Sequence, residues 1–150
     1  MKTFFRWINP LVIGLLRSRV HGLLSFQLMV LDITGRRTGK QYSLPVSFAA
    51  DGKELVCLTL ASNIWWKNFI DRPKLTIWYR GRQHSAEASV ESQDVERIEK
   101  EIKQLIEHNF ADAFFAGIRL NLKLEPNPKD LARAATRHVV LRVRPLDGIV

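Results

Sequence analysis

The segment Thr34-Gly35-Arg36-Arg37-Thr38-Gly39-Lys40 lies between two apolar runs, Phe26 to Ile33 and Tyr42 to Ala49. Its glycines let the backbone take positive φ and approach a ligand closely. Its N–H groups, hydroxyls and cationic side chains suit an oxyanion such as phosphate or carboxylate. A Walker loop has four residues between its glycines and Ser or Thr after its Lys; here there are three, and Gln41 follows. We therefore expect a loop between two strands, which is either an anion site or a solvated basic turn.

The positive charge of the chain is concentrated near its start. The 150 residues carry a net charge of +8, from 23 Lys and Arg against 15 Asp and Glu. Residues 1–40 hold seven of the cations and a single carboxylate, Asp32. Such a field favours an anionic partner, which is a phosphorylated ligand, a membrane surface or nucleic acid. Nucleic acid is the least favoured, because no motif typical of nucleic-acid recognition is present.

Cysteine and histidine give no sign of a disulfide or metal framework. A lone Cys57 excludes an internal disulfide and a cysteine zinc site. Its apolar neighbours predict a buried structural thiol rather than a nucleophile. The histidines are scattered, so we expect no metal site; they are His21, His84, His108 and His138. One free thiol fits a reducing compartment, and we expect a cytoplasmic protein.

Residues 1–24 form an apolar and basic N-terminal segment. Asn9 followed by Pro10 is typical of a helix cap and first helical position, and His21-Gly22 is typical of a helix end, so we expect a helix between them. The clean apolar run, Leu11 to Leu16, is far shorter than the ~20 residues that span a bilayer. We expect a helix that packs on the core through Leu11 and its neighbours. The alternative is peripheral membrane contact, in which a basic amphipathic helix gains about 1 kcal/mol per Lys or Arg near anionic lipid.

Short strands follow this segment. Asp51-Gly52 between Tyr42–Ala49 and Leu55–Ala61 is a strong hairpin signal. Pro45 lies inside the first of these strands, which must therefore be an edge strand or carry a bulge. Apolar residues alternate before and after Arg80-Gly81-Arg82, and this pattern predicts a second hairpin. The alternating residues are Leu75, Ile77 and Tyr79 on one side and His84, Ala86, Ala88 and Val90 on the other.

Helical signals are fewer. The spacing of Val95, Ile98, Ile102, Leu105 and Ile106 predicts an amphipathic helix over residues 92–109. Short helices are expected at 63–69 and 128–135, and a last strand at 139–143. The whole chain, 1–150, is expected to be one α+β domain. Its fold class is a small barrel of about six mainly antiparallel strands, with an N-terminal helix and one long amphipathic helix.

Two separated motifs in this order resemble the deazaflavin-dependent nitroreductase family. The first is the Thr34–Lys40 loop after a hydrophobic strand, and the second is Trp65-Trp66-Lys67-Asn68-Phe69. Asn9-Pro10-Leu11 and the segment Pro128 to Ala134 also resemble that family. The similarity extends over nearly the whole chain. It implies a split β-barrel that binds coenzyme F-420, a deazaflavin with a phosphate and a poly-glutamate tail, and transfers a hydride to a quinone, a nitroaromatic compound or an activated alkene.

The resemblance also implies which residues contact the cofactor. The loop residues Arg36, Arg37, Thr38, Gly39 and Lys40 are expected to hold the tail. Pro45, Val46, Ala61 and Ser62 are expected beside the ring. The remaining expected contacts are Tyr42, Trp65, Trp66, Lys67 and Asn68. Of the two indoles, one is expected in the core and one against the ligand, unless both are in the core.

Several alternatives remain open from the sequence. Asn63 stands where many family members carry a Lys, which leaves FMN as an alternative cofactor. A split barrel that binds FMN, haem or a lipid-like molecule, with or without catalysis, is the second hypothesis, and a scaffold protein is the third. The proton that accompanies the hydride is expected from Tyr42, Tyr79, His84 or solvent. The oligomeric state is also open, and a homodimer is one alternative because split barrels commonly pair through exposed sheet edges.

Overall fold

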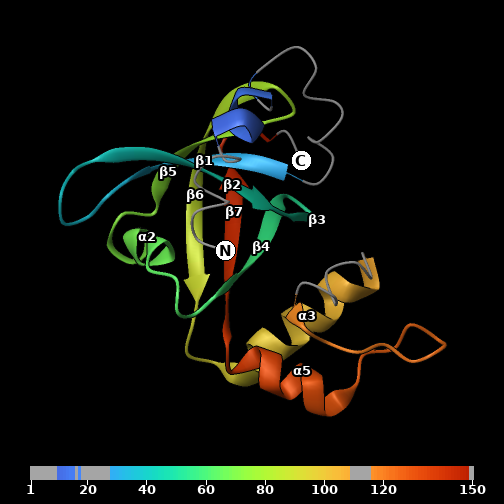
Figure 1. Ribbon diagram of the computed structural model, residues 1–150. Coiled ribbons are helices and arrows are strands. Elements are labelled where there is room, and N and C mark those ends of the chain that lie inside the picture. The colour runs from blue at the N-terminus through green and yellow to red at the C-terminus, as the bar shows by residue number, and fades with distance from the viewer. Residues whose placement is uncertain (1–9, 16, 18–27, 109–115, 149–150) are drawn as a thin grey trace.

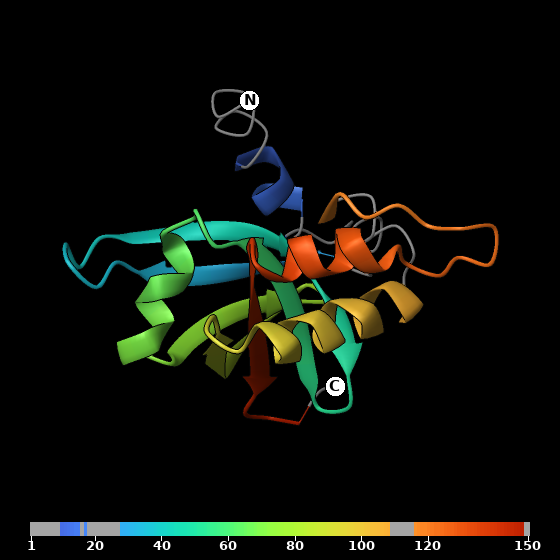
Figure 2. The ribbon, with the colours of Figure 1, turned by 90° about the horizontal axis from the view of Figure 1, so that it is seen from below.

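Seven strands form one antiparallel sheet in the order β2-β1-β5-β6-β7-β4-β3. The computed structural model describes residues 10–15, 17, 28–108 and 116–148. The strands are β1 (Leu28–Thr34), β2 (Gln41–Ser47), β3 (Ala49–Asp51), β4 (Glu54–Leu60), β5 (Lys74–Tyr79), β6 (Arg82–Glu91) and β7 (His138–Pro145). The helices are η2 (Trp65–Lys67), α2 (Asn68–Asp71), α3 (Val95–His108) and α5 (Pro128–Ala135). Figure 1 shows the curled sheet, and Figure 2 shows α3 and α5 side by side against it.

The sheet is curled because one bend connects its two edges. The sequence predicts one strand over Tyr42–Ala49, but the structure divides it at Phe48. β2 pairs with β1 at one edge of the sheet, and β3 pairs with β4 at the other. A single residue separates these two edge strands, so the edges must lie close together, as they do in a barrel. The expected barrel of antiparallel strands is confirmed, with seven strands in place of about six.

Pro45 lies where the sequence argument placed it. It is in β2, an edge strand, opposite Val30 of β1. A proline in an edge strand costs no ladder hydrogen bond, because its missing N–H faces away from the neighbouring strand. The prediction of an edge position is therefore confirmed.

Both glycines of the basic loop are required by its shape. The loop joins β1 to β2, which confirms the strand–loop–strand prediction. Gly39 has φ of 67°, in the left-handed region that favours glycine. A Cβ on Gly35 would lie 3.0 Å from the Thr38 hydroxyl oxygen, which is closer than real Cβ contacts normally come. Substitution at either position would therefore disturb the loop.

Two apolar clusters stabilise the fold. One fills the barrel and includes Leu31, Leu55, Ile77 and Leu141. The other lies between the sheet and the helices, and its members are Val56, Ile98, Ile102, Leu105, Ile106, Ile118, Leu131, Ala134, Ala135 and Val140. Four of the five residues whose spacing predicted α3 are in this second cluster. Val95 is not, because it begins the helix and is exposed.

The remaining sequence predictions of local structure also hold. Arg80 and Gly81 have φ of 48° and 74°, and they form the turn between β5 and β6. α5 begins after Asn127, whose side chain accepts hydrogen bonds from the N–H groups of Lys129 and Asp130. Cys57 is buried in the barrel core. Its role there is that of an apolar packing residue, as its neighbours predicted.

The N-terminal segment is described only in part. Residues 10–15 and 17 are helical, which agrees with a helix that begins near Pro10. Leu11 is 74% exposed, so the prediction that this residue packs on the core is wrong. The rest of residues 1–24 lies outside the described residues, and its membrane contact stays a prediction. Within the described part of the chain, every helix is too short or too polar to cross a membrane.

Candidate functional site

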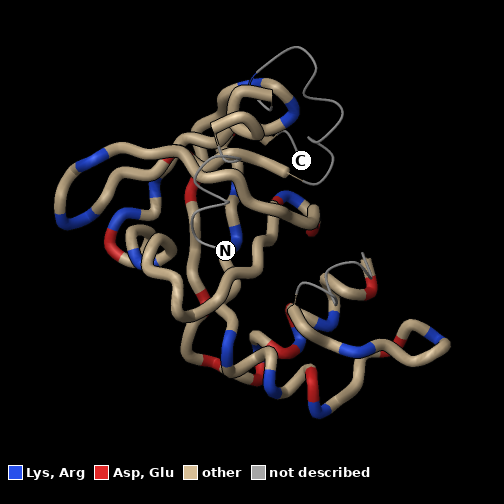
Figure 3. The backbone as a smooth tube through the Cα atoms, in the orientation of Figure 1, with Lys and Arg blue, Asp and Glu red and all other residues tan. Residues whose placement is uncertain are grey.

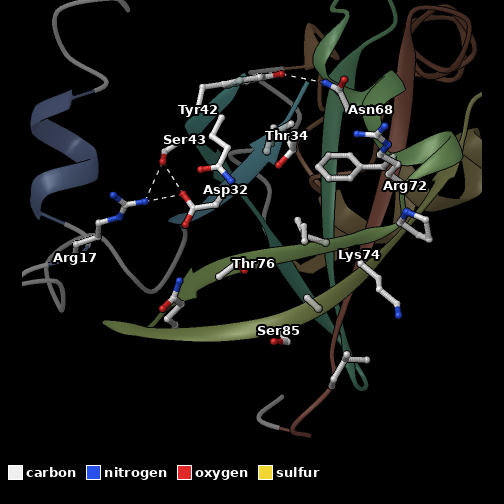
Figure 4. Close-up of a pocket in the computed structure, with 18 residues that line it drawn as sticks. Arg17, Asp32, Thr34, Tyr42, Ser43, Asn68, Arg72, Lys74, Thr76 and Ser85 are labelled. Carbon is white, nitrogen blue, oxygen red and sulfur yellow. Dashed lines mark hydrogen bonds and ion pairs between the residues drawn. The ribbon is translucent and has the colours of Figure 1, made fainter. Parts of the chain in front are cut away.

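A groove of about 1070 Å³ lies on the outer face of strands β2, β1, β5 and β6. Successive side chains of a strand point to opposite faces. Leu31 and Ile33 therefore belong to the barrel core, although Ile33 also lines the groove, whereas Asp32 and Thr34 face outward. Polar and charged residues that line the groove include Ser43, Lys74, Thr76 and Ser85 (Figure 4). The apolar part of its lining is Ile33, Phe69, Pro73, Leu75, Ala86 and Leu146. The groove is large enough for an extended ligand.

The charges of the groove are balanced at one end and unbalanced at the other. Arg17 lies 2.6 Å from a carboxylate oxygen of Asp32 and also donates to the Ser43 hydroxyl at 2.9 Å. Arg72 and Lys74 lie on the opposite side of the groove from Arg17 (Figure 4). Within the described residues neither has an ion pair. This end of the groove therefore presents two cations that are available to an anionic ligand.

Asn68 joins the two motifs that carry the family resemblance. The N–H of Arg36 donates to the Asn68 side-chain oxygen at 2.9 Å. The Asn68 amide in turn donates to the Tyr42 hydroxyl at 3.1 Å and to the Trp65 carbonyl at 2.8 Å. Four predicted site residues are thus brought together, and two of them, Tyr42 and Asn68, line the groove.

Several N–H groups of the basic loop are already paired within the chain. Gly35 donates to the Lys40 carbonyl, Gly39 to the Gly35 carbonyl, and the Lys40 N–H to the Thr38 hydroxyl. Together with Arg36, four of the loop's N–H groups are used. An anion at this loop would therefore depend mainly on its side chains, and the expected contact of the loop with a cofactor tail stays a prediction.

The cationic side chains of this loop differ in whether they form an ion pair. Arg36 lies 3.4 Å from Asp71, a weak and exposed ion pair. Arg37 and Lys40 have no ion pair among the described residues. Figure 3 shows Lys and Arg along the loop between β1 and β2. Thr34 and Gln41 line the groove, and the loop that carries these two cations lies between them in sequence, outside the lining itself.

Three residues were predicted as proton donors, and the structure places them differently. Tyr42 lines the groove, and partial burial raises the pKa of its hydroxyl, so it keeps its proton at neutral pH. Tyr79 is only 3% exposed and packs edge-on against Phe48 in the core. His84 is bound to Asp147 at 2.6 Å, a contact that lowers the pKa of the Asp147 carboxyl. Of the three, Tyr42 is the residue positioned to touch a ligand in the groove.

The paired indoles occupy two environments. Trp66 is buried, its indole N–H has no hydrogen-bond partner among the residues that the structure describes, and the Lys67 ammonium lies 5.4 Å from its ring centre. Trp65 is half-buried and packs edge-on against Phe69. Trp66 is thus the core member of the pair. A ligand contact of Trp65 or Lys67 stays a prediction.

The residues expected beside the ring lie apart from the groove. Pro45 and Val46 are in β2, and Ala61 and Ser62 form an exposed turn after β4, where the Ala61 N–H donates to the Arg137 carbonyl. None of these four residues is among the described residues that line the groove. A second hollow of about 420 Å³ is lined by Ser47, Leu60 and Asn63 among others, which are sequence neighbours of the two pairs. β2 and β4 contact each other in the structure. A ring contact of Pro45, Val46, Ala61 and Ser62 stays a prediction.

Arg72 and Lys74 were missed by the sequence reasoning. They flank Pro73 just before β5, in a stretch that has no glycine and no family motif. The available signal is that two cations follow Asp71 at the start of a strand, which by itself predicts only a solvated turn. Among the described residues, no group of His, Cys, Asp or Glu is placed to hold a metal ion.

Comparison with known proteins defines the fold class. No protein-family model and no curated protein matches the sequence. A pyridoxamine 5′-phosphate oxidase-related, FMN-binding protein from Nostoc punctiforme has a TM-score of 0.57 and 16% identity, over 89% of this chain and 77% of that one. The heme storage protein HutZ from Vibrio cholerae has a TM-score of 0.52 and 14% identity, over 89% and 87%.

A solved structure named as an F-420 reductase has 16% identity over 79% of this chain and 85% of that one, with a TM-score of only 0.47. The two structures with TM-scores above 0.5 show that the fold is shared. The chain has the α+β split β-barrel fold.

Proposed function

We propose that the chain is an oxidoreductase that uses reduced coenzyme F-420 to transfer a hydride to a quinone, a nitroaromatic compound or an activated alkene. The family resemblance supplies the cofactor class. The observation that carries the proposal is the unbalanced positive end of the groove, where Arg72 and Lys74 have no ion pair within the described residues. Arg37 and Lys40, on the loop that connects two of the groove strands, add to the positive charge of this region.

The residues present fit the anionic part of this coenzyme. A phosphate and a poly-glutamate tail carry several negative charges along an extended chain. Four cations without ion pairs among the described residues, spread over the groove and the β1–β2 loop, match such a distribution better than they match one compact charge. The protonated Tyr42 hydroxyl, which accepts a hydrogen bond from Asn68, keeps its own proton for a donor bond in the same groove.

Each part of the chain then has a task. When bound, the reduced deazaflavin supplies the hydride. Arg72 and Lys74, with Arg37 and Lys40, hold the tail by charge-assisted hydrogen bonds. We propose that Pro45, Val46, Ala61 and Ser62 lie beside the ring, and that the proton for the acceptor comes from solvent.

The alternative is a split barrel that binds FMN, haem or a lipid-like molecule. The likeness in fold to an FMN-binding protein favours FMN among these. FMN carries a single phosphate, so it would leave most of the groove cations without a partner.

Anaerobic turnover tests the proposal. The purified chain is mixed with reduced coenzyme F-420 and a 1,4-naphthoquinone, and oxidation of the coenzyme is followed by its absorbance. We expect oxidation that needs both protein and quinone, and none above background with reduced FMN. Turnover with reduced FMN but not with the reduced coenzyme, or no turnover with either of them, would contradict the proposed function.

A further inference from the structure

The second hollow differs in chemistry from the groove. It lies between β4, the bend that separates β2 from β3, and α3, and its volume is about 420 Å³. Most of its wall is apolar and includes Phe48, Leu58, Leu60 and Leu105. No Lys, Arg, Asp or Glu is among the described residues that line it. A charged ligand would lose its hydration here without gaining a counter-ion, so the hollow favours a neutral molecule.

One buried side chain in this hollow has a free hydrogen-bonding atom. His138, at the start of β7, is only 9% exposed. Its Nδ1 lies 2.8 Å from the Ala134 carbonyl oxygen. A carbonyl oxygen only accepts hydrogen bonds, so Nδ1 carries the proton. Burial lowers the pKa of His138, which keeps the ring neutral at pH 7.

It follows that Nε2 of His138 is an acceptor. In a neutral imidazole one nitrogen donates and the other accepts. Nε2 has no hydrogen-bond partner in the described part of the chain, and the ring lines the hollow. Close by, Asn63 donates to the hydroxyl oxygen of Thr59 at 2.9 Å, which leaves the Thr59 hydroxyl proton for another acceptor. The apolar wall thus has a few polar groups, as small-molecule sites usually do.

We infer that this hollow binds a neutral, mostly apolar ring that bears a hydroxyl group, and that the hydroxyl donates its hydrogen bond to Nε2 of His138. A hydroquinone, the product of quinone reduction, belongs to this class; that name rests on the proposed function.

The position of the hollow agrees with this role. Ser47 directly follows Pro45-Val46, and Leu60 and Asn63 flank Ala61-Ser62. Residues that line the hollow are therefore immediate sequence neighbours of the residues proposed for the deazaflavin ring. This agrees with a molecule in the hollow that meets the proposed ring.

Two matched probes test the site without any cofactor. 2-Naphthol carries the required hydroxyl, and 2-methoxynaphthalene has the same ring system with no proton to donate. Each is titrated by fluorescence into the wild-type chain and into His138→Phe, which keeps an apolar ring of similar size. We expect the wild type to prefer 2-naphthol by about two- to twelvefold, the range for one neutral hydrogen bond. We expect His138→Phe to remove that preference and to leave 2-methoxynaphthalene binding unchanged.

A second variant locates the binding. Ala49→Phe adds a ring to the wall of the hollow and should abolish binding of both probes, with the far-ultraviolet circular dichroism unchanged. Equal affinity of the wild type for the two probes would overturn the inference, as would a preference that survives His138→Phe. If His138→Phe does not fold, the wild-type preference decides, together with the ¹⁵N shift of His138 Nε2 on addition of 2-naphthol.

The probes also separate this inference from the proposed function. Loss of coenzyme turnover with the naphthol preference intact would contradict the function and leave the hollow as a site for hydroxyl-bearing rings. Coenzyme turnover without any naphthol preference would support the function and overturn the role of His138.

Discussion

The two cavities of this barrel lie on different parts of the sheet and differ in charge. The groove beside β2, β1, β5 and β6 has charged and polar side chains among apolar ones, with Arg72 and Lys74 unbalanced at one end. The hollow beside β4 and α3 is mainly apolar, and its one titratable lining group among the described residues is His138, held neutral by burial. A ligand with a charged tail suits the first, and a neutral ring suits the second. The comparison teaches that the charge of the lining, more than its volume, decides which kind of ligand a cavity suits.

Removal of the groove cations should have the largest effect, because it should weaken coenzyme binding in the groove and leave binding in the hollow unchanged. Arg72→Ala with Lys74→Ala deletes two charge-assisted contacts, each worth about 1.5–3 kcal/mol. We expect coenzyme affinity to fall by about 100-fold or more, and 2-naphthol binding to stay unchanged. The measurement is a titration of each ligand against the double variant.

A charge-matched control accompanies this variant. Lys103→Ala with Lys123→Ala removes the same charge from exposed positions that line neither cavity. We expect less than a threefold effect on coenzyme affinity, since exposed and distant charges are screened by salt. Equal losses in both double variants would mean that net charge alone drives binding.

Loss of the Asn68 side chain should have the next largest effect. Asn68→Ala deletes the bridge between the basic loop, Tyr42 and Trp65. We expect a loss of about 1–3 kcal/mol in the free energy of unfolding and about tenfold in coenzyme affinity, because the loop loses its anchor. Urea unfolding and the coenzyme titration measure the two quantities.

Asn121 provides the control for this experiment. Its side chain also makes several hydrogen bonds, to the N–H groups of Lys123 and Glu125 and to the Glu125 carboxylate, in a turn away from both cavities. Asn121→Ala should lower stability without changing coenzyme affinity. A similar affinity loss in both variants would show that Asn68 acts through stability and not through the groove.

A smaller effect is expected at Tyr42. Tyr42→Phe removes one neutral hydrogen-bonding group from the groove and keeps the ring. We expect about a threefold loss of coenzyme affinity, the typical value for a single neutral bond. A loss of turnover far beyond the loss of affinity would instead assign the reaction proton to Tyr42.

The smallest expected effect is on stability as a function of pH, and it concerns the hollow. Burial lowers the pKa of His138 below the ordinary histidine value of 6.5. As pH falls through 6.5, the unfolded chain binds the proton first, so the free energy of unfolding decreases until the folded pKa is reached. Urea unfolding at about pH 7.5 and about pH 5.5 should show this loss in the wild type. In His138→Phe the decrease should be smaller, and an equal decrease would contradict the buried neutral state of His138.

The fold was largely predictable because its signals are local. The spacing of Ile98, Ile102 and Leu105 predicts α3, and Asp51-Gly52 predicts the β3–β4 turn. The division of the 42–49 strand at Phe48 was not predictable, since no glycine or proline marks it. That bend is imposed by closure of the barrel, which is a property of the whole sheet.

The candidate site was predictable only where a motif marks it. The loop motif and the Trp-containing motif led to Arg36, Tyr42, Trp65 and Asn68, which the structure brings together. Lys74 and His138 have no such mark. A cation before a strand and a histidine at the start of one are ordinary in sequence, and their importance comes from strands that are distant along the chain. The free cation and the unpartnered ring nitrogen are visible only after the sheet is assembled.

The central claim is that the groove holds the anionic tail of a deazaflavin, and a salt-dependent binding titration tests it most directly. The wild-type chain is titrated with oxidised coenzyme F-420, with FMN in parallel, at low and at high salt. We predict micromolar or tighter binding of the coenzyme that weakens as salt rises, and weaker binding of FMN. Binding of FMN in preference to the coenzyme, or coenzyme binding that does not respond to salt, would contradict the account.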